Sequence, residues 1–168
     1  MFTSISLPQA AQFSSPNPVT LICTTKPDGS ANLATVSWWT YLSYAPNKIA
    51  FAMAKISYTG ERVREKKELV LTLPGTSLEK TALGCGSTSG RDTDKVSMFQ
   101  VEMTKVPSSD IAIPVHSRLA ICATLCQTVE VGDHYLYICD VTAVYGNEEE
   151  TPLFAWGGYG VLAPAQKA

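Results

Sequence analysis

The segment that decides the fold is Val19-Thr20-Leu21-Ile22-Cys23-Thr24-Thr25-Lys26-Pro27-Asp28-Gly29-Ser30-Ala31-Asn32-Leu33-Ala34-Thr35-Val36-Ser37-Trp38-Trp39. Its first part, Val19–Thr25, is apolar and β-branched, which favours a strand. The next five residues, Lys26–Ser30, contain a proline and a glycine that supply the dihedral angles of a tight turn. Ala31–Trp39 then returns as a second strand. The sequence therefore predicts a β-hairpin, the unit from which antiparallel sheets are built.

Further strands follow along the chain. They are predicted at Lys48–Lys55, Leu69–Leu73, Leu119–Val131, Tyr135–Tyr145 and Leu153–Tyr159. Turn residues separate these runs, among them Pro46-Asn47, Pro74-Gly75, Gly132-Asp133-His134 and the acidic Gly146–Glu150. Short strands with turns between them indicate a barrel or a sandwich. The predicted fold class is mainly β, with a few helices.

The helices are predicted between these strands, and 168 residues suffice for one domain with a core. Tyr58–Glu68 is the clearest, with Thr59 as the residue expected to cap its start. Thr76–Leu83 and a short helix within Arg91–Phe99 are predicted as well. Met1–Pro18 contains three prolines and is predicted to be irregular.

Composition excludes some partners. The formal net charge is −2 and the pI is about 5.7, so there is no electrostatic reason to expect nucleic acid or an anionic membrane. Charged residues make up 17% of the chain, a low share that favours a surface covered by a second subunit. No apolar run approaches the roughly 20 residues of a membrane helix, and the start lacks the basic residues of a secretory signal.

The five cysteines, Cys23, Cys85, Cys122, Cys126 and Cys139, are odd in number and contain no CxxC pair. This pattern fits neither a disulfide framework nor a structural zinc site. We expect reduced, mostly buried thiols in a cytoplasmic protein. No HExxH motif or histidine cluster predicts a metal, and no GxSxG elbow marks a serine hydrolase.

Two segments have the composition of a binding site. Asn32–Thr40 places two indoles and two hydroxyls at a strand end, where they would face a planar ligand; the alternative is two core tryptophans beside strand-end hydroxyls. Lys55-Ile56-Ser57-Tyr58-Thr59 brings a cation and hydroxyls to a helix start, whose free N–H groups favour a phosphate. A plain helix cap with an exposed lysine is the alternative there.

Two loops complete the candidates. Gly84–Asp94 is rich in glycine, which lets the backbone approach a ligand closely. It matches neither the GxxxxGK[ST] phosphate loop nor the GxGxxG dinucleotide motif, so a capped surface loop is the alternative. Gly132-Asp133-His134 holds one of the two histidines of the chain, and an exposed turn histidine is the alternative there.

In this order and spacing, the motifs resemble those of the flavin reductase-like FMN-binding split barrels, in particular the flavoredoxin-like members. The resembling segments are Asn32–Trp39, Lys55–Thr59, Cys85–Lys95 and Val131–His134, and the resemblance runs from about Val19 to Val144. It implies one domain over residues 1–168, a six-stranded antiparallel Greek-key barrel, a homodimer, and FMN near the dimer interface.

The resemblance also implies roles for single residues. Trp38, Trp39 and Thr40, with Asn32, Thr35 and Ser37 on the same strand, would line the isoalloxazine ring. The phosphate would be held by Lys55, Ser57 and Thr59, next to Tyr58. Ser87, Ser89 and Arg91 would approach the ring or ribityl chain. In the same segment, Cys85, Gly86, Gly90 and Lys95 are further expected cofactor-binding residues. His134 would be the catalytic position, where it receives a nicotinamide at the flavin face. Lysine at position 55 departs from relatives that have arginine nearby, and it binds phosphate as a point charge.

The implied function is an FMN-binding NAD(P)H:flavin oxidoreductase, which passes a hydride from NAD(P)H to FMN and then to an acceptor. The alternative is a flavoredoxin-type electron carrier with tightly bound FMN and no direct use of NAD(P)H. A third possibility is a barrel that only stores or senses flavin. A pyridoxal phosphate-linked oxidase shares the split barrel but not these motifs.

Overall fold

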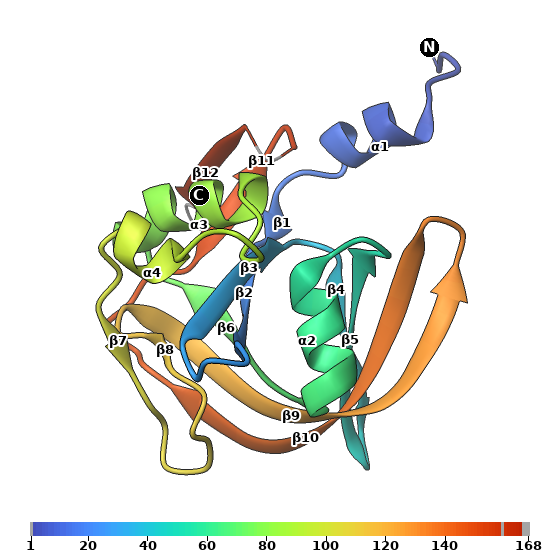
Figure 1. The fold of residues 1–168 in the computed structure, drawn as a ribbon. Coiled ribbons are helices and arrows are strands. Elements are labelled where there is room, and N and C mark those ends of the chain that lie inside the picture. Colours follow the sequence, from blue (N-terminus) through green and yellow to red (C-terminus); the bar gives the residue numbers. More distant parts are fainter. Residues whose placement is uncertain (1, 159, 166–168) are drawn as a thin grey trace.

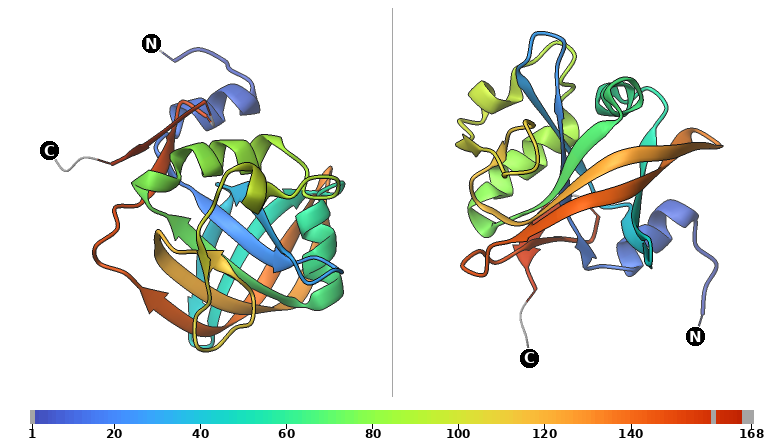
Figure 2. Two further views of the ribbon diagram at one scale, coloured as in Figure 1. Left: turned by 60° about the vertical axis from the view of Figure 1, so that its left-hand side comes forward. Right: turned by 90° about the horizontal axis from the view of Figure 1, so that it is seen from below.

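The computed structural model describes residues 2–158 and 160–165. Most of the chain forms one curved, seven-stranded antiparallel sheet, with the strand order β3-β2-β6-β9-β10-β5-β4 (Figure 1). Its strands are β2 (Thr20–Thr25), β3 (Ala31–Val36), β4 (Trp39–Tyr44), β5 (Asn47–Ala54), β6 (Glu68–Pro74), β9 (Ser117–Val131) and β10 (His134–Gly146). The mainly β fold predicted from the sequence is confirmed, and the long β9–β10 hairpin supplies its curvature (Figure 2).

Smaller elements surround this sheet. A three-stranded sheet is formed by β1 (Asn17–Pro18), β11 (Leu153–Trp156) and β12 (Val161–Pro164), and a two-stranded one by β7 (Met103–Thr104) and β8 (Ile113–Pro114). The helices are α1 (Leu7–Phe13), α2 (Tyr58–Lys66), α3 (Glu79–Ser87), α4 (Lys95–Met98) and the 3-10 turn η1 (Thr76–Leu78). Helix α3 lies across β2 and β3 (Figure 2).

The central strands are buried on both faces, which explains their nearly continuous apolar sequence. Along β2, Leu21 and Cys23 belong to the cluster that packs against α3, α4 and β11. Ile22, between them, points to the opposite side and joins the cluster inside the curve of the sheet. There it meets Phe51 from β5 and Val63 from α2. The period of two thus divides one strand between two cores.

The sheet has two edges, β3 and β4, and these strands are consecutive in the chain. Only Ser37 and Trp38 separate them, so the sheet must bend until its two edges approach each other. The backbone N–H of Ala52 on β5 donates to the carbonyl of Trp38 at 2.8 Å, which holds this junction. The barrel is therefore split beside β3, and this split is where the site lies.

Some local predictions were wrong. Met1–Pro18 was predicted to be irregular, but Leu7–Phe13 is helical because Ser6 and Gln9 form a capping box and Pro8 stands in the first turn. Ala31–Trp39 is not one strand, because the junction interrupts it after Val36. The first four residues of the predicted Gly84–Asp94 loop are helical, since α3 continues to Ser87. Of the predicted strand Leu153–Tyr159, β11 ends at Trp156, and Tyr159 lies outside the described residues.

Candidate functional site

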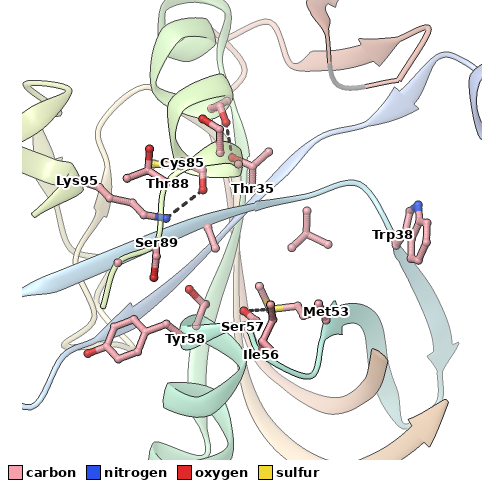
Figure 3. A pocket seen from close by; sticks show the side chains of 18 of the residues that line it. Thr35, Trp38, Met53, Ile56, Ser57, Tyr58, Cys85, Thr88, Ser89 and Lys95 are labelled. Atoms are coloured by element: carbon pink, nitrogen blue, oxygen red, sulfur yellow. Dashed lines mark hydrogen bonds between the residues drawn. The ribbon is translucent and has the colours of Figure 1, made fainter. Parts of the chain in front are cut away.

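A cavity of about 780 Å³ opens at the split of the barrel. This volume lies within the usual range of small-molecule and cofactor sites. Its walls come from the end of β3, the end of β5, the start of α2, and the end of α3 with the loop that follows. Figure 3 shows Trp38 on one side of the cavity and Lys95 with Ser89 on the other.

Twelve of the residues singled out from the sequence line this cavity. They are Thr35, Trp38, Ser57, Tyr58, Thr59, Cys85, Gly86, Ser87, Ser89, Gly90, Lys95 and His134. Four separate segments of the chain thus converge on one space. The sequence predicted these residues without showing that α3 and α2 face each other across the cavity.

The start of α2 offers hydrogen-bond donors to this cavity. Ser57, not Thr59 as predicted, is the N-cap, and its hydroxyl accepts from the N–H of Gly60 at 3.2 Å. This cap leaves the first-turn N–H groups of Tyr58 and Thr59 for a ligand. The Thr59 hydroxyl accepts from the side-chain amide of Asn32 at 2.8 Å, so its own proton is free to point at an anion. Asn32 itself lies behind the cavity wall.

Lys95 adds a buried positive charge. Its ammonium group donates to the carbonyls of Leu33 at 2.8 Å and Cys85 at 3.0 Å, and only 2% of the residue is exposed. Burial lowers the pKa of Lys95 from its ordinary value, because removal from water disfavours the charged ammonium. An ammonium has three donors, so one N–H remains for a ligand. Since no described residue lining the cavity is Asp or Glu, this side of the cavity suits an anion.

The other side of the cavity is apolar and aromatic. The rings of Trp38 and His134 lie 5.1 Å apart at an angle of 34°. His134 is held through its Nδ1 by Asp133 at 2.8 Å, and this contact lowers the pKa of the Asp133 carboxyl. Trp38 is 56% exposed and Ile56 is 91% exposed, so this side is open to a second molecule.

Six residues from the sequence prediction do not line the cavity. Asn32 and Ser37 stand apart from its walls, as do Trp39 and Thr40 on β4. The ammonium group of Lys55 is bound instead to Glu130, and the guanidinium group of Arg91 donates to Glu61 at 2.6 Å. Conversely, the apolar wall residues Ala34, Val36, Ala52, Met53 and Ala82 were not predicted, because nothing in the sequence distinguishes them from core residues.

Cys85 is a wall residue and not a reactive thiol. It is buried, and burial raises the pKa of its thiol to about 11, so the thiolate form is scarce at neutral pH. Cys23 and Cys139 are buried as well, with a thiol pKa of about 12 each. All five cysteines are free, and only Cys126 is exposed.

Metal and membrane contacts find no support in the described part of the chain. Nowhere in residues 2–158 and 160–165 do three or more His, Cys, Asp or Glu side chains gather as a metal site would require. Over the same residues, the helices are too short or too polar to cross a membrane.

The fold and site define a split-barrel protein with a cofactor-sized cavity suited to a molecule that carries an anion at one end and an apolar ring at the other. The model of the flavin reductase like domain matches residues 13–163, nearly the whole chain. The chain belongs to the flavin reductase-like domain family.

The chain is also similar to a curated protein and to solved structures. The chain is 23% identical to the uncharacterized protein YddH of Escherichia coli over 107 residues, which cover 63% of this chain and 57% of YddH. It thus spans just over half the length of that relative. Its fold is similar to that of flavoredoxin of Desulfovibrio vulgaris (TM-score 0.84, 18% identity, 99% of this chain and 95% of that one). It is also similar to an FMN-binding protein of Thermus thermophilus (TM-score 0.83, 19% identity, 100% and 97%).

Thiol reactivity tests the assignment of Cys85. In the native protein at pH 8, a disulfide reagent is expected to react rapidly with about one thiol per chain, that of the exposed Cys126. Cys85 should react slowly, because a thiol with a pKa of about 11 is almost wholly protonated at this pH. The Cys126→Ser variant should lose the fast phase, and Cys85→Ser should keep it. A fast phase lost in Cys85→Ser would show that Cys85 is an accessible nucleophile.

Proposed function

We propose that the cavity binds FMN and that the protein uses it for two-electron transfer from NAD(P)H. The observation that carries this proposal is the polarity of the cavity, which has anion donors from α2 and Lys95 at one side and an open aromatic wall at the other. FMN has the same polarity, with a phosphate at one end and a flat ring at the other. The family assignment supports a flavin.

The donors of this structure fit a phosphate. Ser57 and Thr59, the first-turn N–H groups of α2 and the ammonium of Lys95 would hold it, because the helix dipole and the buried charge both favour an anion. Lys55 has no part in this arrangement, since its ammonium group lies against Glu130. The apolar residues of β3 and β5 would cover the ring.

The protein contributes position and electrostatics. When bound, FMN supplies the two-electron chemistry of its ring, so no acid or base of the protein is required for hydride transfer. Trp38 and His134 form an open aromatic wall against which a nicotinamide ring would lie, and Asp133 holds the imidazole through Nδ1. His134 is thus proposed as a positioning residue for the electron donor.

The second candidate is an electron carrier that holds FMN tightly and exchanges electrons with other proteins. The fold similarity to flavoredoxin favours it. The same exposed wall, with Trp38 and Ile56, would then meet a protein surface in place of a nucleotide.

A homodimer is part of the proposal. Helix α1 buries none of its residues and projects from the rest of the chain (Figure 1). Its Leu7 is 84% exposed and its Phe13 80% exposed, and the edge strand β4 exposes Tyr41, Leu42 and Tyr44. Large exposed apolar side chains are typical of surfaces that a partner covers.

Affinity for FMN tests the phosphate site. Thr59→Val is expected to weaken FMN binding about 10- to 100-fold, because it removes a hydrogen bond to a charged group worth about 1.5–3 kcal/mol. Thr59→Ser should restore the affinity. The matched control is Thr40→Val, since Thr40 is exposed and does not line the cavity. Equal FMN affinity for the wild type and Thr59→Val, measured by fluorescence quenching, would refute this site.

Reduction by nucleotides tests the role of His134. Anaerobic NADH or NADPH is expected to bleach the flavin absorbance of the wild type. His134→Ala should slow this reaction about five- to tenfold, the loss expected for one aromatic contact, without a comparable loss of FMN affinity. Equal losses of rate and of FMN affinity would refute a positioning role. A yellow protein that neither nucleotide bleaches would favour the carrier.

Sedimentation equilibrium tests the homodimer. The expected mass is twice the chain mass of 18.1 kDa. Leu42→Asp, on the exposed face of β4, should shift the protein toward the monomer, because it places a charge on a surface that the dimer would bury. A wild type that sediments with the mass of one chain at all concentrations would contradict the proposal.

A further inference from the structure

Beside the cavity, residues 89–91 of the loop after α3 meet residues 58–61 at the start of α2 in a seam. The guanidinium of Arg91 donates to the carboxylate of Glu61 at 2.6 Å. The same guanidinium lies 5.0 Å from the ring centre of Tyr58. Two kinds of contact, an ion pair and a cation–π contact, therefore join the loop to the helix.

Gly90 brings the two segments together. A Cβ atom at position 90 would lie 1.8 Å from Oδ1 of Asn32 and 3.4 Å from the Tyr58 ring, so only glycine allows this approach. Gly90 is buried, whereas its neighbour Arg91 is exposed. The backbone at Gly90 thus fills the gap between loop and helix, and Arg91 covers it from outside.

The seam lies directly behind the phosphate donors. Tyr58, Thr59, Ser89 and Gly90 line the cavity, but Glu61 and Arg91 do not. They stand one or two residues farther along the same two segments. A molecule whose anion reaches Thr59 and Ser89 therefore ends next to the Arg91–Glu61 ion pair.

We propose that the Arg91–Glu61 ion pair makes the site selective for FMN over FAD, a proposal that rests on the FMN function proposed above. The phosphate is the terminal group of FMN, so the ion pair behind it does not oppose FMN binding. In FAD the same phosphate continues into a second phosphate and an adenosine. In our proposal these groups would pass between loop and helix, and that separation would break the ion pair.

Arg91 has a different role here from the one that the family resemblance implied. A direct phosphate or ribityl ligand would point into the cavity, but the guanidinium of Arg91 is held by Glu61 and the Tyr58 ring, and Arg91 does not line the cavity. Glu61 decides between the two roles. If Arg91 acts through the ion pair, loss of Glu61 and loss of Arg91 have the same effect. If Arg91 binds the flavin, loss of Glu61 frees it to bind more tightly.

The test measures the dissociation constants of FMN and FAD by fluorescence titration for the wild type, Arg91→Ala, Glu61→Gln and the double variant. We expect the wild type to prefer FMN by about tenfold or more, and each single variant to reduce this preference about fivefold, the size of one partly exposed ion pair. The double variant should resemble the single variants, because each single variant already removes the Arg91–Glu61 ion pair.

The control is Lys66→Ala, which removes a cation from the far end of the same helix and should leave the preference unchanged. A wild type without preference would overturn the proposal, as would a selectivity that neither single variant changes. Arg91→Ala with weakened binding of both flavins, combined with Glu61→Gln without weakening, would overturn it in favour of direct contact. A wild type that binds neither flavin would refute the proposed function itself, and a wild type that binds both equally would refute only the selectivity.

Discussion

The structure depends on the junction at Ser37 and Trp38, where the chain passes from one edge of the sheet to the other. Because β3 and β4 are sequence neighbours and opposite edges, the sheet has to curve through its full width to join them. The backbone hydrogen bond between Ala52 and Trp38 fixes that curve. The same geometry leaves a split beside β3, and the cavity is a consequence of the way the sheet bends.

The polar side of the cavity is built around groups that are costly to bury. The charge of Lys95 is satisfied by two carbonyls and no counter-ion, and Oδ1 of Asn32 lies buried without a hydrogen-bond partner. Burying a charge or an unpaired polar atom in this way opposes folding. For Lys95, which faces the cavity, a bound anion would supply the missing charge. Buried groups that destabilise the free protein and would be paired by a ligand are expected at a cofactor site.

Neighbouring residues on α2 and on the loop after α3 lie partly in the cavity wall and partly in the seam outside it. Ser57 and Thr59 line the cavity, while Glu61, two residues beyond Thr59 on α2, pairs with Arg91 of the loop outside it. On the loop, Ser89 likewise lines the cavity and Arg91 does not. Along these two short segments, some side chains thus line the cavity and their neighbours pair outside it.

The sequence alone determined most of the long strands and the helix at Tyr58, because turn residues, strand periodicity and helix starts are local signals. The motifs and the family resemblance pointed to twelve of the residues that line the cavity. It did not determine that Ser57 and not Thr59 caps α2, since both are good capping residues and only the path of the backbone selects one. Nor did it separate Lys95 from Lys55. Both are lysines in matching motifs, yet Lys95 is buried between the carbonyls of Leu33 and Cys85, whereas the ammonium group of Lys55 lies on the surface beside Glu130. The direction in which a long side chain points is set by partners that are distant in sequence. Only the tertiary structure brings those partners together.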